Sequence, residues 1–149
     1  MTPRLRRLLL AAGLMLPVSA AAAPQQPQDA LERGLWMQVD EAERKLQTSD
    51  FVIRDPALNA YVRRVLCREV GEDACGEARI YIMRTPYFNA SMAPNGMMQV
   101  WSGLLLRMEN EAQLAAVLGH EFAHYREQHT LRLFRNIRDK TNAAAWLGF

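Results

Sequence analysis

The sequence predicts an α+β fold that is mostly helical, with a small antiparallel sheet beside one helix. Apolar residues recur every three or four positions over much of the 149-residue chain, which is the period of an amphipathic helix. Two short apolar segments, residues 79–84 and 97–101, are bounded by turn residues and predict strands. Because only a turn-rich stretch separates these segments, we expect a hairpin-like or adjacent antiparallel pair.

The first 23 residues have the composition of a secretory signal peptide. Three arginines precede an apolar run over residues 8–16, and small residues follow it. The run is shorter than the ~20 residues that a membrane-spanning helix needs. We therefore expect residues 1–23 to be removed and residues 24–149 to form one domain that is periplasmic or otherwise exported. A retained N-terminal anchor is the alternative.

The charge of the chain changes when this leader is set aside. The 18 basic and 16 acidic residues give a formal net charge of +2. Three of the basic residues, Arg4, Arg6 and Arg7, belong to the leader, so residues 24–149 carry a formal charge of −1. Since a basic patch is the electrostatic footprint of nucleic-acid binding, we expect no nucleic-acid partner.

Two amphipathic helices are predicted before the first strand. Asp55 and Pro56 are a capping residue and a first-turn proline, so the second helix is expected to begin there. The first helix covers residues 30–46, and its apolar stripe for packing consists of Leu31, Leu35, Val39, Ala42 and Leu46. Its charged residues are expected to face water, and they are Glu32, Arg33, Asp40, Glu43 and Arg44.

The two cysteines of the chain, Cys67 and Cys75, are expected to form a disulfide. An even cysteine count in an exported protein favours a bridge. Their eight-residue offset, with no histidine close by, argues against two metal ligands and against a cysteine nucleophile.

Three helical segments are predicted after the second strand. A short helix over residues 102–108 precedes a longer one that Asn110 can cap, and Gly119 in the longer helix would let another backbone approach closely. An amphipathic stretch follows His129, with an arginine-rich side that we expect to be a solvated helix face. Peripheral contact with a membrane surface is the alternative. The arginines are Arg132, Arg135 and Arg138.

The longer helix carries the motif His-Glu-Phe-Ala-His at residues 120–124. His120 and His124 are four residues apart, so they lie on one helix face and can bind one Zn²⁺ at ~2.0–2.1 Å. Glu121 is next to the first histidine, where it can take a proton from a metal-bound water. The motif therefore predicts one zinc ion per chain and a hydrolytic reaction. The alternative is three polar residues on an ordinary amphipathic helix.

The motif and the residues before it resemble metallopeptidase family forty-eight, the HtpX-, BepA- and Oma-like gluzincins. The matching residues run from Asn89-Ala90 through Pro94 and Gly103 to the helix that contains the motif. The family usually shows Asn-Ala-Phe-Ala-x-Pro-Gly-Gly in the first of these segments. This chain departs from it in residues 91–92 and 95, which lie on the substrate side of the site.

The resemblance implies a zincin-like fold and a zinc-dependent endopeptidase. It implies that His120 and His124 bind zinc and that Glu121 is the general base. It also implies that the strand before the metal-binding helix is a sheet edge on which an extended substrate lies. The implied substrates are unfolded or misassembled proteins of the bacterial envelope.

The third protein ligand of the zinc site is not evident in the sequence. In the family it is a glutamate from a helix well downstream, but the chain ends 25 residues after His124. His129 would lie about 180° around the helix from His120, so it can join the site only if the helix breaks. Glu127 would extend the line of ligands and is expected to pair with an arginine in water, and Asp139 is more distant.

We therefore expect a truncated catalytic domain that binds zinc weakly and has little peptidase activity alone. The alternative is a non-catalytic, chaperone-like or assembly factor that holds client proteins on the exposed strand.

Overall fold

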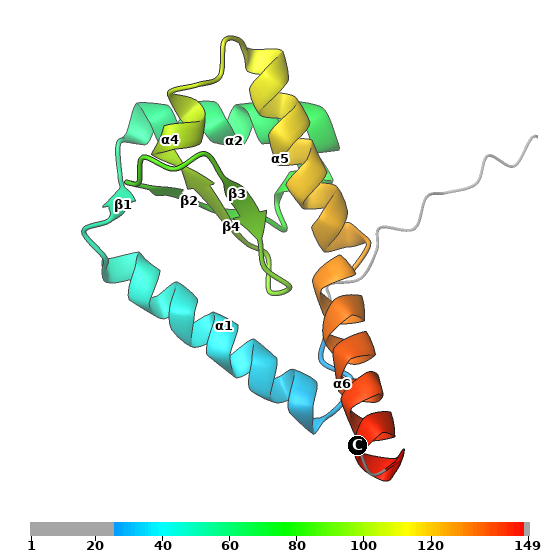
Figure 1. Ribbon diagram of the computed structural model, residues 1–149. Helices are drawn as coiled ribbons and strands as arrows, with labels where there is room; N and C mark the ends of the chain where they lie inside the picture. Colours follow the sequence, from blue (N-terminus) through cyan, green and yellow to red (C-terminus); the bar gives the residue numbers. More distant parts are fainter. Residues whose placement is uncertain (1–25, 148–149) are drawn as a thin grey trace, which may run out of the picture.

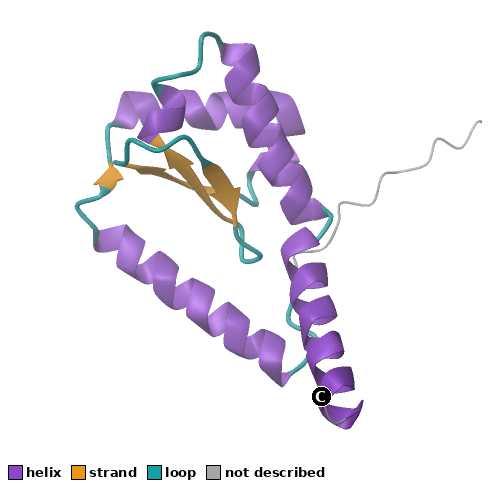
Figure 2. Cartoon of the chain, viewed as in Figure 1, coloured by secondary structure: helices purple, strands orange, loops and turns teal. Residues whose placement is uncertain are grey.

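The computed structural model describes residues 26–147, with side chains up to Thr141, so the predicted signal peptide lies outside the described residues. Helices dominate the chain, and the strands form one small sheet (Figure 2). The predicted α+β class is confirmed. The elements in chain order are α1 (Ala30–Thr48), β1 (Val52–Ile53), α2 (Pro56–Val70), α3 (Glu72–Cys75), β2 (Arg79–Met83), β3 (Ala90–Met92), β4 (Met97–Trp101), α4 (Ser102–Leu105), α5 (Glu111–Arg126) and α6 (His129–Leu147).

The sheet is mixed, with strand order β1-β2-β4-β3. The two predicted strands, β2 and β4, are adjacent but parallel, with Ile82 opposite Val100, so the expected antiparallel pairing was wrong. The reason is a third strand, β3, in the segment predicted to be only turns. The chain reverses between β2 and β3 and again at the tight turn before β4, where Gly96 has a φ of 90°. Two reversals make β4 run in the same direction as β2.

The hydrophobic core lies between the sheet and helices α2 and α5. Val62 and Leu66 of α2 are fully buried, as are Ile82 of β2, Val100 of β4 and Leu118 of α5. Asp55 caps α2 by accepting a hydrogen bond from the backbone N–H of Leu58 at 2.7 Å, and Pro56 takes the first turn, as predicted. Helix α1 lies across the sheet from α2 (Figure 1).

The charged faces of α1 and α6 face water only in part. The two arginines predicted to be exposed on α1 are exposed, but the two glutamates predicted with them are buried. Glu32 and Glu43 of α1 are 1% and 5% exposed, whereas Leu31 and Met37 of the same helix are 59% and 71% exposed. The reason is that both buried carboxylates have arginine partners. Glu32 binds the half-buried Arg135 of α6 at 2.6 and 3.0 Å.

A second contact joins the same two helices. Arg138 of α6 pairs with Asp29, the residue that caps α1, so Arg135 and Arg138 do not form a solvated face. Only Arg132, whose side chain is 59% exposed, fits the prediction. None of the helices in residues 26–147 combines the length and apolar character that crossing a bilayer requires.

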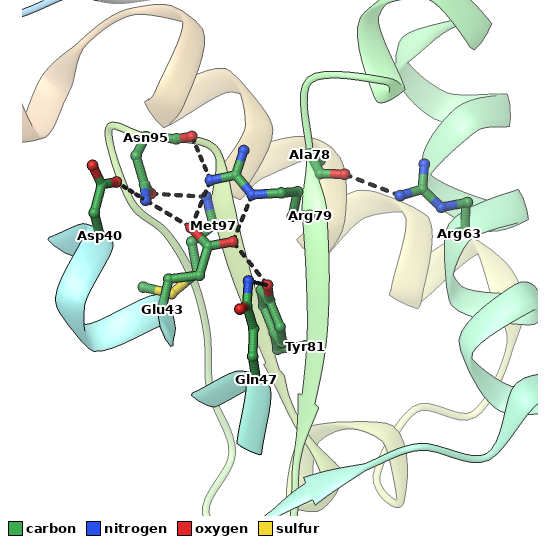
Figure 3. Close-up of polar contacts among 9 residues, drawn as sticks. All are labelled: Asp40, Glu43, Gln47, Arg63, Ala78, Arg79, Tyr81, Asn95 and Met97. Carbon is green, nitrogen blue, oxygen red and sulfur yellow. Dashed lines mark hydrogen bonds and ion pairs between the residues drawn. The ribbon is translucent and has the colours of Figure 1, made fainter. Parts of the chain in front are cut away.

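Glu43 attaches α1 to the sheet through a polar network (Figure 3). Its carboxylate accepts hydrogen bonds from the Arg79 guanidinium at 2.5 and 2.6 Å, from the Tyr81 hydroxyl at 2.8 Å and from the Asn95 amide at 2.8 Å. Arg79 also donates to the backbone oxygen of Asn95 at 2.9 Å. The arginine hydrogen bonds hold the pKa of Glu43 below its usual value, against the opposing effect of burial. Three elements, α1, β2 and the turn before β4, therefore meet at one carboxylate.

Cys67 and Cys75 form a disulfide, as predicted, with Cα atoms 5.0 Å apart. The bridge joins the last turn of α2 to the end of α3, which leads into β2. It therefore fixes how the chain leaves the helix that packs against α5.

Removing the disulfide should destabilise the fold moderately. Replacing both cysteines with alanine should lower the free energy of unfolding by about 2–3 kcal/mol, because the unfolded chain regains the entropy of a short closed loop. Urea unfolding followed by circular dichroism measures the loss. A reducing agent should destabilise the wild-type chain and leave the double variant unchanged. Equal sensitivity of both proteins would contradict the assignment.

Removing the Glu43 carboxylate should also destabilise the fold. Glu43→Ala should lower the free energy of unfolding by about 1–3 kcal/mol, because Arg79, Tyr81 and Asn95 lose their shared acceptor. Glu41→Ala is the matched control, since Glu41 is on the same helix with a half-exposed side chain, and its effect should be much smaller.

The lowered pKa of Glu43 predicts that its contribution to stability depends on pH. Because folding lowers the pKa of Glu43, its stabilisation is complete above the usual value of about 4.5 and is lost as pH falls through the lower folded value. The stability difference between the wild-type chain and Glu43→Gln should therefore shrink in acid. A difference that grows below pH 4.5 would contradict this assignment.

Candidate metal centre

Helix α5 holds the motif because its sequence has a clear start and one apolar face. The Asn110 side chain caps the helix by accepting a hydrogen bond from the backbone N–H of Gln113 at 3.0 Å, as predicted. Four residues face the core and are buried, namely Leu114, Leu118, Phe122 and Tyr125. This burial turns the other side of the helix, with His120, away from the core.

His120 and His124 point their Nε2 atoms at each other, 3.0 Å apart. Their rings are nearly perpendicular, with centroids 4.5 Å apart. Two imidazole nitrogens bound to one tetrahedral zinc would be about 3.3–3.4 Å apart, given bonds of ~2.0–2.1 Å. The donor type and the spacing therefore fit one zinc ion, with an adjustment of a few tenths of an ångström.

Glu121 is half-buried and lines a hollow of about 390 Å³ together with His120. The other lining residues are the polar Asn89 and five apolar residues, namely Phe88, Ala90, Leu104, Ala116 and Val117. The hollow lies where α5 meets the start of β3. It therefore places a carboxylate and an imidazole beside the end of a strand.

The strand beside the motif is β3, and it is an edge of the sheet. It pairs with β4 on one side only, with Ser91 opposite Gln99, and the Ser91 side chain is exposed. The last strand before the helix, β4, lies between β2 and β3, so it is not the edge that the resemblance implied. Sequence reasoning missed β3 because a three-residue strand beside Pro94-Asn95-Gly96 has the composition of a turn.

Helices α5 and α6 are separated by a break at Gln128, which has a φ of 55°. The half-turn separation predicted for an unbroken helix therefore does not apply to His129. Its Nδ1 lies 2.7 Å from Nδ1 of His124, on the side of that ring away from His120. Glu127 is exposed and lies 3.5 Å from Arg132, as expected, and Asp139 pairs with Arg138.

No third ligand joins the histidine pair within the described residues. Among them, no other histidine, cysteine or carboxylate atom lies within 4.8 Å of ligand atoms of both His120 and His124. The one group of three such residues is Cys67, Glu72 and Cys75, and its two cysteines are held in the disulfide. The structure thus brings together two imidazole nitrogens of a type that can bind a metal.

Residues 56–146 of the chain match the sequence profile of Peptidase family M48. The chain belongs to this family. It is 33% identical to a beta-barrel assembly-enhancing protease assigned in Vibrio cholerae. This match extends over 91 residues, which are 60% of this chain. The chain is 34% identical over 82 residues, 51% of its length, to the human mitochondrial metalloendopeptidase OMA1.

The match to the beta-barrel assembly-enhancing protease of Escherichia coli K12 is longer, at 28% identity over 109 residues and 70% of this chain. These matches cover 19%, 16% and 22% of the respective relatives, so the chain spans about a fifth of their length.

Gly103 holds the segment before β3 in place in this M48 chain. A Cβ atom at Gly103 would lie 2.2 Å from the backbone oxygen of Pro86, so only glycine fits there. Gly119 differs from the prediction, because its close neighbour is a side chain, with Glu69 Cγ 2.8 Å from the position of a Cβ. The close backbone approach expected at Gly119 of α5 therefore occurs at Gly103 of α4.

Loss of the α5 cap should weaken the helix that presents the motif. Asn110→Ala should lower the free energy of unfolding by about 1 kcal/mol, because the backbone N–H of Gln113 loses its acceptor. Asn110→Asp supplies the same acceptor and should be close to wild type. Thermal unfolding compares the three proteins, and equal losses in both variants would show that the cap does not contribute.

Proposed function

We propose that this chain is the motif-bearing part of a zinc-dependent endopeptidase. The observation that carries the proposal is the pair of Nε2 atoms 3.0 Å apart, with Glu121 in the same helical turn. Membership of Peptidase family M48 and relatives named as proteases support it. In this proposal His120 and His124 bind zinc and Glu121 is the general base.

The chemistry divides between the metal and the residues of this chain. Zinc held by His120 and His124 would supply a Lewis acid for a scissile carbonyl and would lower the pKa of a coordinated water to roughly 7. Glu121 accepts the proton of the attacking water and returns it to the leaving amine. The free edge of β3 binds an extended peptide through backbone hydrogen bonds beside Glu121.

The third zinc ligand in this proposal comes from outside the described residues. A catalytic zinc site has three protein ligands and one open position, and the described residues supply two. The resemblance implies a glutamate from a further helix. We therefore expect the 149-residue chain to bind zinc weakly by itself.

The proposed substrates are unfolded or misassembled proteins of the bacterial envelope. The order of charged, apolar and small residues over residues 1–23 supports export, and two relatives are named for β-barrel assembly. An extended peptide can add to β3 only if it is not already folded, which favours unfolded chains over native ones.

The second candidate function is a non-catalytic, chaperone-like or assembly factor. The presence of only two ligands among the described residues favours it. In that case β3 would hold client proteins without cleaving them.

Glu121→Gln should abolish cleavage and leave zinc binding intact. Removal of a general base lowers turnover by about 10²–10⁴-fold, while the two histidines are unchanged. Zinc content and casein cleavage should be measured side by side, with saturating zinc to offset weak binding. Glu127→Gln is the matched control, because Glu127 is an exposed glutamate at the end of the same helix and should alter neither quantity.

The same assays separate the two candidate functions. Cleavage that survives in Glu121→Gln would show that Glu121 is not the base. A wild-type chain that cleaves no casein at saturating zinc and suppresses client aggregation as well as Glu121→Gln does would favour the holding factor for these 149 residues.

A further inference from the structure

The turn between α5 and α6 brings a third histidine against the zinc-binding pair. Helix α5 ends at Arg126, and Gln128 takes a left-handed conformation with a φ of 55°. In a continuous helix His129 would lie about 140° around the axis from His124. The turn instead directs His129 back towards the motif, with ring centroids 4.7 Å apart.

The contact between these rings joins defined atoms. Nδ1 of His129 lies 2.7 Å from Nδ1 of His124, within hydrogen-bond distance. In a neutral imidazole one nitrogen carries the proton and the other accepts. One of the two Nδ1 atoms must therefore donate and the other accept.

The direction of this hydrogen bond follows from the metal site. Nε2 of His124 faces Nε2 of His120, so a shared metal would take the lone pair of Nε2. The proton of His124 must then be on Nδ1, where it can be donated only to an unprotonated Nδ1 of His129. The hydrogen bond made by one ring nitrogen decides which tautomer the other nitrogen presents to a metal.

We propose that His129 is a positioning residue, which holds His124 in the Nδ1–H tautomer with Nε2 free for zinc. The inference rests on the proposed function, since it assigns Nε2 of His124 to the metal. It gives His129 a role other than that of the third ligand, which the sequence allowed only if the helix breaks. As a ligand, His129 would need a nitrogen near both Nε2 atoms, but its Nδ1 lies behind the ring of His124.

Two substitutions of His129 separate its hydrogen bond from its shape. His129→Phe keeps an aromatic ring of similar size and removes the acceptor. His129→Asn carries an amide that can accept from Nδ1–H of His124. Gln128→Gly is the control for a change in the turn itself, because glycine adopts a positive φ readily. Circular dichroism and thermal unfolding check that each variant folds.

The first readout is the tautomer of His124 in the metal-free chain. Long-range ¹H–¹⁵N spectra of the imidazole rings, recorded where the histidines are neutral, distinguish Nδ1–H from Nε2–H. We expect Nδ1–H to dominate in the wild-type chain, in His129→Asn and in Gln128→Gly. In His129→Phe we expect a shift towards Nε2–H.

The second readout is zinc affinity, measured by competition with a chelating dye. His129→Phe should weaken zinc binding by about 10–100-fold, the range found for loss of the hydrogen-bond partner of a metal ligand. His129→Asn should recover most of the affinity. If His129 were a direct ligand, the cobalt-substituted wild-type and His129→Asn proteins would differ in their absorption spectra, which would overturn the inference.

The failure of this inference differs from the failure of the proposed function. An unchanged His124 tautomer in His129→Phe overturns the inference whether or not the chain binds zinc. If His129→Phe changes the His124 tautomer but the wild-type chain takes up no zinc, the proposed zinc peptidase is overturned. The assignment of His129 as the hydrogen-bond partner of His124 then stands. Equal zinc affinity in all variants also overturns the inference.

Discussion

The burial of one face of α5 is the constraint on which the rest of the site depends. Leu118 and Phe122 pack into the core beside α2 and the sheet. Because residues on opposite faces of a helix cannot both point inward, this packing directs His120 and Glu121 towards the hollow at the start of β3. The predicted metal ligands thus lie on a helix that packs against α2 on one side and against the edge strand β3 on the other.

Ion pairs attach much of the remainder of the described chain, beside the buried apolar side chain of Leu131 in α6. Helix α1 contacts the sheet through Glu43 and α6 through Glu32, while large apolar side chains of α1 are exposed. Ion pairs of this kind demand a defined geometry but add limited net stability, since burial of each charge is costly. The main effect of these ion pairs is therefore to specify where α1 and α6 lie relative to the core, and their effect on the stability of the fold is smaller.

The helices, the cap at Asn110 and the disulfide could be predicted from the sequence because each depends on residues close together in the chain. Periodicity predicted α5, and the cysteine count predicted the bridge. The partners of Glu32 and Glu43 could not be predicted, because Arg135 and Arg79 are far away in sequence. A charged residue on an amphipathic helix is ordinarily solvated, so nothing local indicated their burial.

The sequence by itself determined the family, the α+β class and the residues able to bind a metal, because motif spacing on a helix is a local property. Tertiary structure alone decided that β3 rather than β4 is an edge strand, since that depends on how β2, β3 and β4 associate. It also decided where His129 lies, because a single left-handed residue, Gln128, ends one helix and redirects the next. Such a residue leaves no periodic signal in the sequence, and its effect is visible only once the histidines that it brings together are seen in space.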